Sequence, residues 1–280
     1  MRIFIGKLVS CIIAVMFIIN MSGCATYRVH PEFKERHKNI HAVAVMPPEA
    51  DAYILTFQGD KKRLNDLVPI MEKTTIQELE KVLSDKSYVI KKLDLGKEAL
   101  DTKPQLRETL FNVNKLFTKS LEDIAKGKKK TFTYSLGSEV NTFADLAGSD
   151  ILIFTKEEGI KKSAGEIAKD VTKGLVTSAA LLLIGVVYVP IPQTAATIAH
   201  IAIVDSNDGA ILWYNNNVTN PNWDPENQKQ LAQLIRSLVS PFPDSAFKQK
   251  DVKEKLIEKK QPGQMPADVK KGTVLVPVGN

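Results

Sequence analysis

Residues 197–214 read TIAHIAIV (197–204), DSNDG (205–209) and AILWY (210–214), and this stretch decides the fold class. Two apolar runs flank a short segment of Asp, Asn, Ser and Gly, the residue types that form tight turns between antiparallel strands. The stretch therefore predicts a β-hairpin. Side chains alternate between the two faces of a strand, so His200 shares a face with Ile198 and Ala202. We therefore interpret His200 as a hydrogen-bonded core or edge residue and not as a catalyst.

Three further apolar runs have the length and composition of strands. They lie at 40–46, 88–90 and 151–154. Apolar residues on both faces of the first run are typical of a central strand in a covered sheet. Pro47 and Pro48 follow directly. We expect them to end that strand, because proline has no N–H group to donate to the hydrogen bonds between strands.

Two long stretches have the periodicity of amphipathic helices. The first covers 64–83 and contains Pro69, which predicts a kink or two shorter helices. The second follows Thr102, whose spacing from Gln105 is that of a capping box, and ends near Gly127.

Two shorter helices complete the pattern. One is expected at 142–146, and the other follows Asp224 as N-cap and Pro225 at the first helical position. The order of strands and helices predicts an α/β (α+β) sandwich, in which helices pack on a mixed sheet.

The N-terminal segment has the pattern of a secretory signal. Arg2 and Lys7 give the chain a positive start, and a 12-residue apolar run follows at 8–19. That run is too short to cross a hydrocarbon core of about 30 Å as a helix, which needs about 20 residues, but it fits the apolar region of a signal peptide. Gly23 and Cys24 follow it, and this arrangement resembles the lipobox of bacterial lipoproteins.

The lipobox resemblance implies cleavage between Gly23 and Cys24 and acylation of Cys24. Two or three acyl chains would hold the protein firmly on a membrane, whereas one chain holds it only marginally. Ala25 follows the cysteine, and the sorting rules of lipoproteins then imply the outer membrane, with the protein facing the periplasm. The alternative is an uncleaved signal anchor.

The expected domain organisation follows from these signals. Residues 1–23 form the signal peptide, and 24–39 form a polar, lipidated tether. Residues 40–245 form the α/β periplasmic domain, with an apolar insert at about 164–192. Residues 246–280 are charged and are expected to form a poorly ordered tail.

Charge and cysteine content exclude several classes of protein. The net charge is +6, but Arg2 and Lys7 fall in the expected signal peptide, and 246–280 contains eight Lys and four acidic residues. Residues 24–245 therefore balance at 28 basic and 28 acidic residues, so no nucleic-acid partner is expected. After cleavage Cys24 is the only cysteine, so neither an intrachain disulfide nor a cysteine metal site is expected.

The insert contains a segment without charge, residues 174–191. Three interpretations remain open: a buried helix followed by an extended piece over the sheet, a surface that contacts the bilayer or other subunits, and a transmembrane helix. The candidate contact residues are its large side chains Leu175, Leu181, Leu182, Leu183, Ile184, Val186, Val187 and Tyr188.

The sequence contains none of the common catalytic or cofactor motifs, such as G-x-S-x-G, the P-loop, G-x-G-x-x-G or H-E-x-x-H. His30, His37 and His41 cluster in the expected tether, where no rigid frame would hold a metal. The acidic turn at 205–209 lacks the spacing of a calcium loop. We therefore expect no enzyme, no cofactor and no metal site.

Two further features have alternative interpretations. Residues 126–130 form a basic loop, which is expected to be an exposed turn, with a phosphate or anionic-lipid contact as the alternative. Trp213, Tyr214 and Trp223 predict an aromatic cluster under the last helix, with a sugar- or peptide-stacking site as the alternative.

Three short motifs resemble a known family: MPP at 46–48, ADLAGSDILIF at 144–154, and AIVD at 202–205 with GAILW at 209–213. Together they resemble a family of bacterial outer-membrane lipoproteins of unknown function. That family is related in fold to the curli-export channel lipoprotein, the amino-terminal domain of TolB and the lipoprotein activators of penicillin-binding proteins. The resemblance covers about residues 38–245 and implies an anticodon-binding-like fold used for protein contacts. It carries over no catalytic residues.

These patterns lead to three functional expectations. The leading one is a non-enzymatic outer-membrane lipoprotein that acts in envelope assembly or export, with the membrane and other envelope proteins as partners. The second is an oligomeric secretion-channel subunit with residues 174–192 near the membrane, which makes a homo-oligomer an open alternative. The third is a periplasmic ligand-binding or hydrolytic protein with a site around Trp213 and Asp205.

Overall fold

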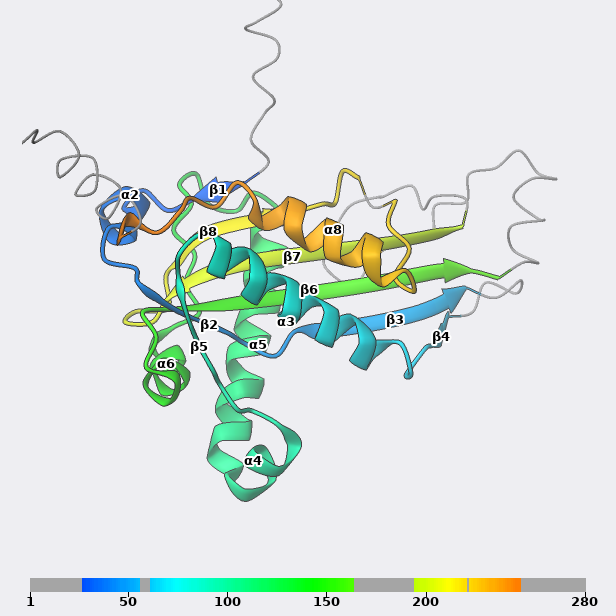
Figure 1. Cartoon of the computed structure of the whole chain (residues 1–280), viewed down its shortest axis with the longest axis horizontal. Coiled ribbons are helices and arrows are strands. Elements are labelled where there is room, and N and C mark those ends of the chain that lie inside the picture. The colour runs from blue at the N-terminus through cyan, green and yellow to red at the C-terminus, as the bar shows by residue number, and fades with distance from the viewer. Residues whose placement is uncertain (1–26, 56–60, 164–193, 221, 248–280) are drawn as a thin grey trace, which may run out of the picture.

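The computed structural model describes residues 27–55, 61–163, 194–220 and 222–247 (Figure 1). Within these residues one eight-stranded sheet has the order β1-β8-β7-β6-β2-β5, and β3 pairs with β6 and β4. The strands are β1 (Arg28–Val29), β2 (Ala42–Val45), β3 (Glu49–Leu55), β4 (Lys61–Arg63), β5 (Val89–Lys91), β6 (Ile151–Lys162), β7 (Ala195–Asp205) and β8 (Ile211–Asn216). The helices are α2 (Phe33–His37), α3 (Val68–Asp85), α4 (Lys97–Thr102), α5 (Pro104–Ala125), α6 (Asn141–Ala147), α8 (Gln228–Val239) and the 3-10 helix η1 (Ser138–Val140).

The sheet is mixed and open, and helices cover both of its faces. β2 runs parallel to β5 and β6, and β3 also runs parallel to β6, whereas β6–β7, β7–β8, β1–β8 and β3–β4 are antiparallel. α3 and α8 lie side by side on the face toward the viewer in Figure 1, and α5 and α6 lie behind the sheet. The prediction of a mixed sheet with helices packed on it is confirmed.

Side-chain alternation along the central strands builds the two halves of the core. On β6, Ile151 and Ile153 belong to the cluster under α3 and α8, and Leu152 and Phe154 belong to the cluster under α5. Every residue of β7 is buried. These strands are apolar on both faces because helices cover both faces of the sheet.

β2 ends at Val45, just before the two prolines, and a separate strand, β3, begins at Glu49. β2 pairs with β6 at Val43 and Ile151, and β3 resumes the pairing with the same neighbour at Glu49 and Lys156. The expectation that the strand ends at the prolines is therefore confirmed, although the sequence did not predict that β3 would pair with the same neighbour after them. β3 escaped prediction because residues 49–52 alternate alanine with acidic residues, which are weak strand formers. β4 escaped it because its three residues are too few to show a period.

Proline also marks the starts of two helices. Pro69 falls in the first turn of α3, which runs unbroken, so the predicted kink is wrong. α5 likewise has Pro104 in its first turn. The N–H groups of a first helical turn have no intrahelical partner, so proline is tolerated there. Thr102 ends α4, and its hydroxyl donates to the Glu98 carbonyl (3.1 Å), so the predicted capping box does not form.

The last helix begins later than the sequence predicts. Its N-cap is Asn227, whose side chain accepts from the Gln230 N–H (3.2 Å), and not Asp224. The Asp224 carboxylate instead accepts from the Glu226 N–H (3.0 Å), forming an Asx turn that competes with helix initiation.

The expected tether is largely part of the folded domain. Val29 of β1 pairs with Trp213 of β8, and Phe33 of α2 packs against the core. The prediction of a free tether over 24–39 is therefore wrong from Tyr27 onward. These segments are short, so no hydrophobic period could reveal them in the sequence.

The predicted hairpin turn is confirmed, and Gly209 in it is expected to be intolerant of substitution. Gly209 has a φ of +69°, and a Cβ there would lie 2.1 Å from the Gly137 carbonyl oxygen. Gly209→Ala should therefore lower the free energy of unfolding, measured in urea, by more than about 2 kcal/mol, since left-handed backbone alone costs roughly 1–2 kcal/mol. Gly148→Ala is the control, because Gly148 has a similar φ of +63° but open space around it. Equal losses in the two variants would contradict the steric argument.

Candidate functional site

The predicted cleavage and acylation site and the candidate contact residues of the insert lie outside the described residues. These are Gly23 and Cys24, together with the insert residues Leu175, Leu181, Leu182, Leu183, Ile184, Val186, Val187 and Tyr188. The structure describes the chain from Tyr27 onward, three residues after Cys24, and shows how this part joins the domain.

The N-terminal segment is held on the domain from Tyr27 onward. The Tyr27 ring stacks on Trp213 with 6.0 Å between ring centroids. Arg28 Nη1 donates to the Ile124 carbonyl at the end of α5 (3.3 Å). An extended chain covers at most about 3.6 Å per residue, so the Cα atom of Cys24 lies within about 11 Å of that of Tyr27. A membrane anchor at Cys24 would therefore hold the domain close to the bilayer.

An ion network fastens α2 to the β7–β8 hairpin. The Arg36 guanidinium contacts Asp208 (2.7 Å), Glu32 (2.7 Å) and Asp205 (3.0 Å). These carboxylates, Asp208 first, raise the pKa of Arg36 above its ordinary value. The acidic turn is thus occupied by an internal cation, which matches its interpretation as a structural turn.

The three N-terminal histidines point to separate places. His37 Nε2 is 2.7 Å from the Tyr88 hydroxyl, and burial lowers the pKa of His37 below its ordinary value. His30 Nδ1 accepts from a backbone N–H, and the His41 ring packs on Phe247. Within the described part of the chain, no group of three His, Cys, Asp or Glu residues is arranged to hold a metal ion.

His200 is a buried core residue, as predicted. Its Nδ1 lies 2.7 Å from the Tyr214 hydroxyl, which also accepts from Asn216 Nδ2 (3.0 Å). Burial, with a smaller contribution from Lys156, lowers the pKa of His200 to about 3. The imidazole is therefore neutral at physiological pH and has no solvent access for acid–base chemistry.

The aromatic residues of β8 do not form a ligand-stacking surface. Trp213 and Tyr214 are both buried, and alternation places them in the clusters on opposite faces of the sheet. The predicted cluster under the last helix is therefore wrong for Tyr214, whereas Trp213 belongs to the cluster that contains the apolar residues of α8, and Trp223 packs against it. The alternative of a stacking site at Trp213 is wrong, because this side chain is buried. Trp213 instead contacts Tyr27 and Phe242 in an aromatic cluster that closes over the N-terminal segment.

Glu157 is a buried carboxyl group that the sequence did not single out. Among the described residues, neither of its oxygens has a partner in good hydrogen-bond geometry. Burial, reinforced by the nearby Glu72 carboxylate and opposed by Thr75, raises the pKa of Glu157 to about 8. In sequence it stands between Lys156 and Glu158, a run that resembles a solvated surface, so no local signal could have revealed its burial.

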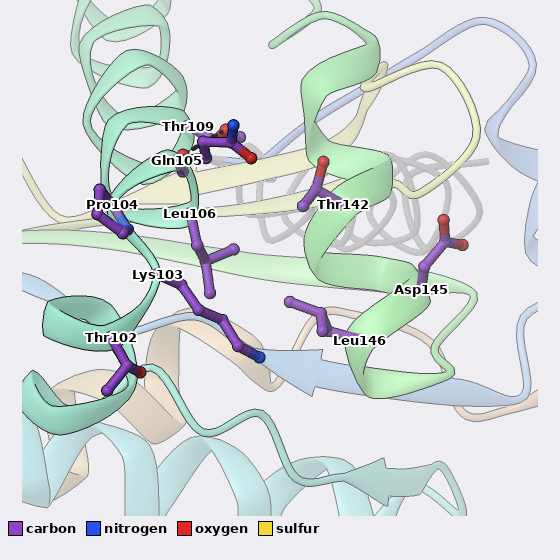
Figure 2. A pocket seen from close by; sticks show the side chains of 9 residues that line it. All are labelled: Thr102, Lys103, Pro104, Gln105, Leu106, Thr109, Thr142, Asp145 and Leu146. Atoms are coloured by element: carbon purple, nitrogen blue, oxygen red, sulfur yellow. Dashed lines mark hydrogen bonds between the residues drawn. The ribbon is translucent and has the colours of Figure 1, made fainter.

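An open cleft of about 1010 Å³ lies between the start of α5 and α6 (Figure 2). Leu106 and Leu146 extend toward each other from the two helices. The lining residues are Thr102, Lys103, Pro104, Gln105, Leu106, Thr109, Thr142, Asp145 and Leu146. Beside Leu106 and Leu146 they include three threonines, Lys103 and Asp145, a mixture of apolar and polar side chains that is also found at protein–protein interfaces.

Comparisons with known proteins give no further guide to function. No family model matches the chain, and a search of curated proteins finds no significant match. No helix among the described residues has both the length and the apolar character needed to cross a membrane.

Proposed function

We propose that this protein is a non-enzymatic lipoprotein of the bacterial outer membrane that faces the periplasm and acts in envelope assembly or export through protein–protein contacts. The observation that carries the proposal is the sequence of residues 1–24, in which a positive start and a short apolar run lead to Gly23 and Cys24. The attachment of Tyr27 to the core supports it, because the fold begins three residues after the expected acylation site.

The mixed sheet supports a finer assignment, which is also a proposal. We infer an anticodon-binding-like domain related in fold to the export-channel and TolB-type proteins that the short motifs resemble. Residues 164–192 fall between β6 and β7, the two longest strands among the described residues. This placement favours a second candidate function, an oligomeric secretion-channel subunit with residues 174–192 near the membrane.

Sorting to the outer membrane is tested by Ala25→Asp. Aspartate directly after the lipidated cysteine is the inner-membrane retention signal of lipoproteins, so the variant should move from outer- to inner-membrane fractions on a density gradient. Ala25→Ser is the matched control and should stay in the outer membrane. A wild-type protein that sediments with the inner membrane would contradict the proposed location.

Protein–protein action is tested by cross-linking in intact envelopes. Leu146 is 50% exposed and lines the α5–α6 cleft, so Leu146→Arg should remove a partner cross-link without unfolding the domain. The mass of the detergent-extracted protein separates the two candidates, because a ring of many copies supports the channel subunit. Cross-links that reach no protein would contradict both.

A further inference from the structure

The basic loop at 126–130 lies beside the attachment point of the N-terminal segment. Arg28 Nη1 donates to the Ile124 carbonyl (3.3 Å), two residues before Lys126. Cys24 lies four residues before Arg28, within about 15 Å along a fully extended chain. Sequence spacing alone gives no sign of this neighbourhood, because it depends on the pairing of β1 with β8.

The loop is folded onto the end of α5. Gly127, with a φ of +61°, donates to the Ile124 carbonyl (3.1 Å), and Lys128 N–H donates to the Asp123 carbonyl (3.1 Å). This pair of bonds is the Schellman motif that closes a helix C-terminus. Tyr134 also holds the loop in place, because its hydroxyl donates to the Asp123 carbonyl (3.2 Å) and accepts from the Lys129 N–H (3.3 Å). The backbone therefore presents residues 126–130 outward, and all five are exposed.

The charge of this surface is unbalanced. Four lysines of the loop and Arg28 contribute five positive charges, and the carboxylates that form ion pairs with these lysines are Glu122 and Asp123. Lys126 and Lys128 contact those carboxylates at 3.4 and 2.5 Å, but the two lysine side chains are 49% and 54% exposed. Exposed pairs of this kind are weak and exchange readily for other anions. The excess is local, because residues 24–245 as a whole are neutral.

We propose that residues 126–130, with Arg28, form a contact surface for the anionic phospholipid headgroups of the membrane that holds the protein. The inference rests on the proposed anchor at Cys24. A bilayer is the occupant because the anchor joins the domain beside this loop, so acylation brings a polyanionic surface to these lysines. Clusters of basic residues next to a membrane attachment bind anionic lipid by this electrostatic attraction, and a lipid chain with a basic patch holds better than either alone.

The test uses the chain from residue 24 to 280 with Cys24→Ser, which carries no acyl group. Its partition onto phosphatidylglycerol–phosphatidylcholine vesicles and onto pure phosphatidylcholine vesicles is measured by co-sedimentation. We expect binding to the anionic vesicles alone, and its loss in about 0.5 M salt, where the Debye length is only a few ångströms. Each lysine near an anionic surface contributes about fivefold, so the triple variant Lys126→Gln, Lys128→Gln, Lys130→Gln should bind at least tenfold more weakly.

Two further variants keep the result interpretable. Lys130→Glu lies outside the Schellman motif and should weaken binding with an unchanged melting temperature. Changing three exposed lysines on α3 and β4 to Gln, namely Lys62, Lys73 and Lys81, alters the net charge equally and should leave binding within about twofold. Equal weakening by this control set, or equal binding to both kinds of vesicle, would overturn the proposal. These outcomes do not depend on whether Cys24 is acylated in cells, which is decided separately by the mass of the native protein.

Discussion

Cys24→Ser in the full chain is expected to abolish lipid labelling and to release the protein from membranes. Each buried methylene of an acyl chain contributes roughly 0.8 kcal/mol, so the loss of two or three chains removes the whole of the firm attachment. Incorporation of labelled palmitate and fractionation of membranes washed in about 0.5 M salt, which screens contacts of the basic loop with lipid, measure the effect. We expect that the apolar run at 8–19 does not replace the anchor, because it is too short to span the hydrocarbon core as a helix.

Cys11→Ser is the matched control for this experiment. Cys11 lies inside the apolar run, so the same chemical change there should leave labelling and fractionation unchanged. A Cys24→Ser protein that remained in washed membranes with residues 1–23 attached would favour an uncleaved signal anchor. Loss of labelling in both variants would show that the effect is not specific to Cys24.

Glu157→Gln is expected to make the domain more stable at alkaline pH and to leave its stability in acid nearly unchanged. Burial first, and then the Glu72 carboxylate of α3, hold the pKa of Glu157 at about 8 against an ordinary value of 4.5. The folded state therefore keeps a proton that the unfolded state releases. Stability is full below about pH 4.5 and falls as pH rises, until the loss is complete above about pH 8.

The size of this effect follows from the shift in pKa. At about 1.4 kcal/mol per pKa unit, the loss across this range is on the order of 5 kcal/mol. Urea unfolding at about pH 5 and about pH 9 should show a wild-type decline that Glu157→Gln largely removes. Glu139→Gln, at an exposed position, is the control and should follow the wild type. A Glu157→Gln protein that declined in parallel with the wild type would show that Glu157 is not the group responsible.

The sequence predicted correctly those helices and strands whose determinants lie within the segment itself. The hairpin at 197–214 combines two apolar runs with an Asx–Gly turn, and both determinants lie within the segment. The central position of β7 follows from the absence of a polar face. The apolar positions of α5 likewise recur with the helical period.

Features that depend on distant contacts could not be predicted in the same way. β1 is two residues long and forms only because Val29 meets Trp213. The start of α8 was misplaced because Asp224 and Asn227 are both good N-caps, and the Asx turn at Asp224 decides between them.

Some parts of the candidate site could likewise be predicted from local sequence, and others depend on distant contacts. Cys24 is predicted from the segment that precedes it, because a signal and its cleavage point are contiguous in the chain. The neighbourhood of Arg28 and the basic loop requires α5 to end beside β1, which no sequence spacing indicates. The burial of Glu157 depends in the same way on α3 covering β6.

Intact-mass measurement of the protein extracted from native membranes tests the central claim most directly. We predict a chain that lacks residues 1–23 and carries acyl groups on Cys24, with the excess mass located on the N-terminal fragment after proteolysis. A chain that retains residues 1–23, or a free thiol at Cys24, would contradict it.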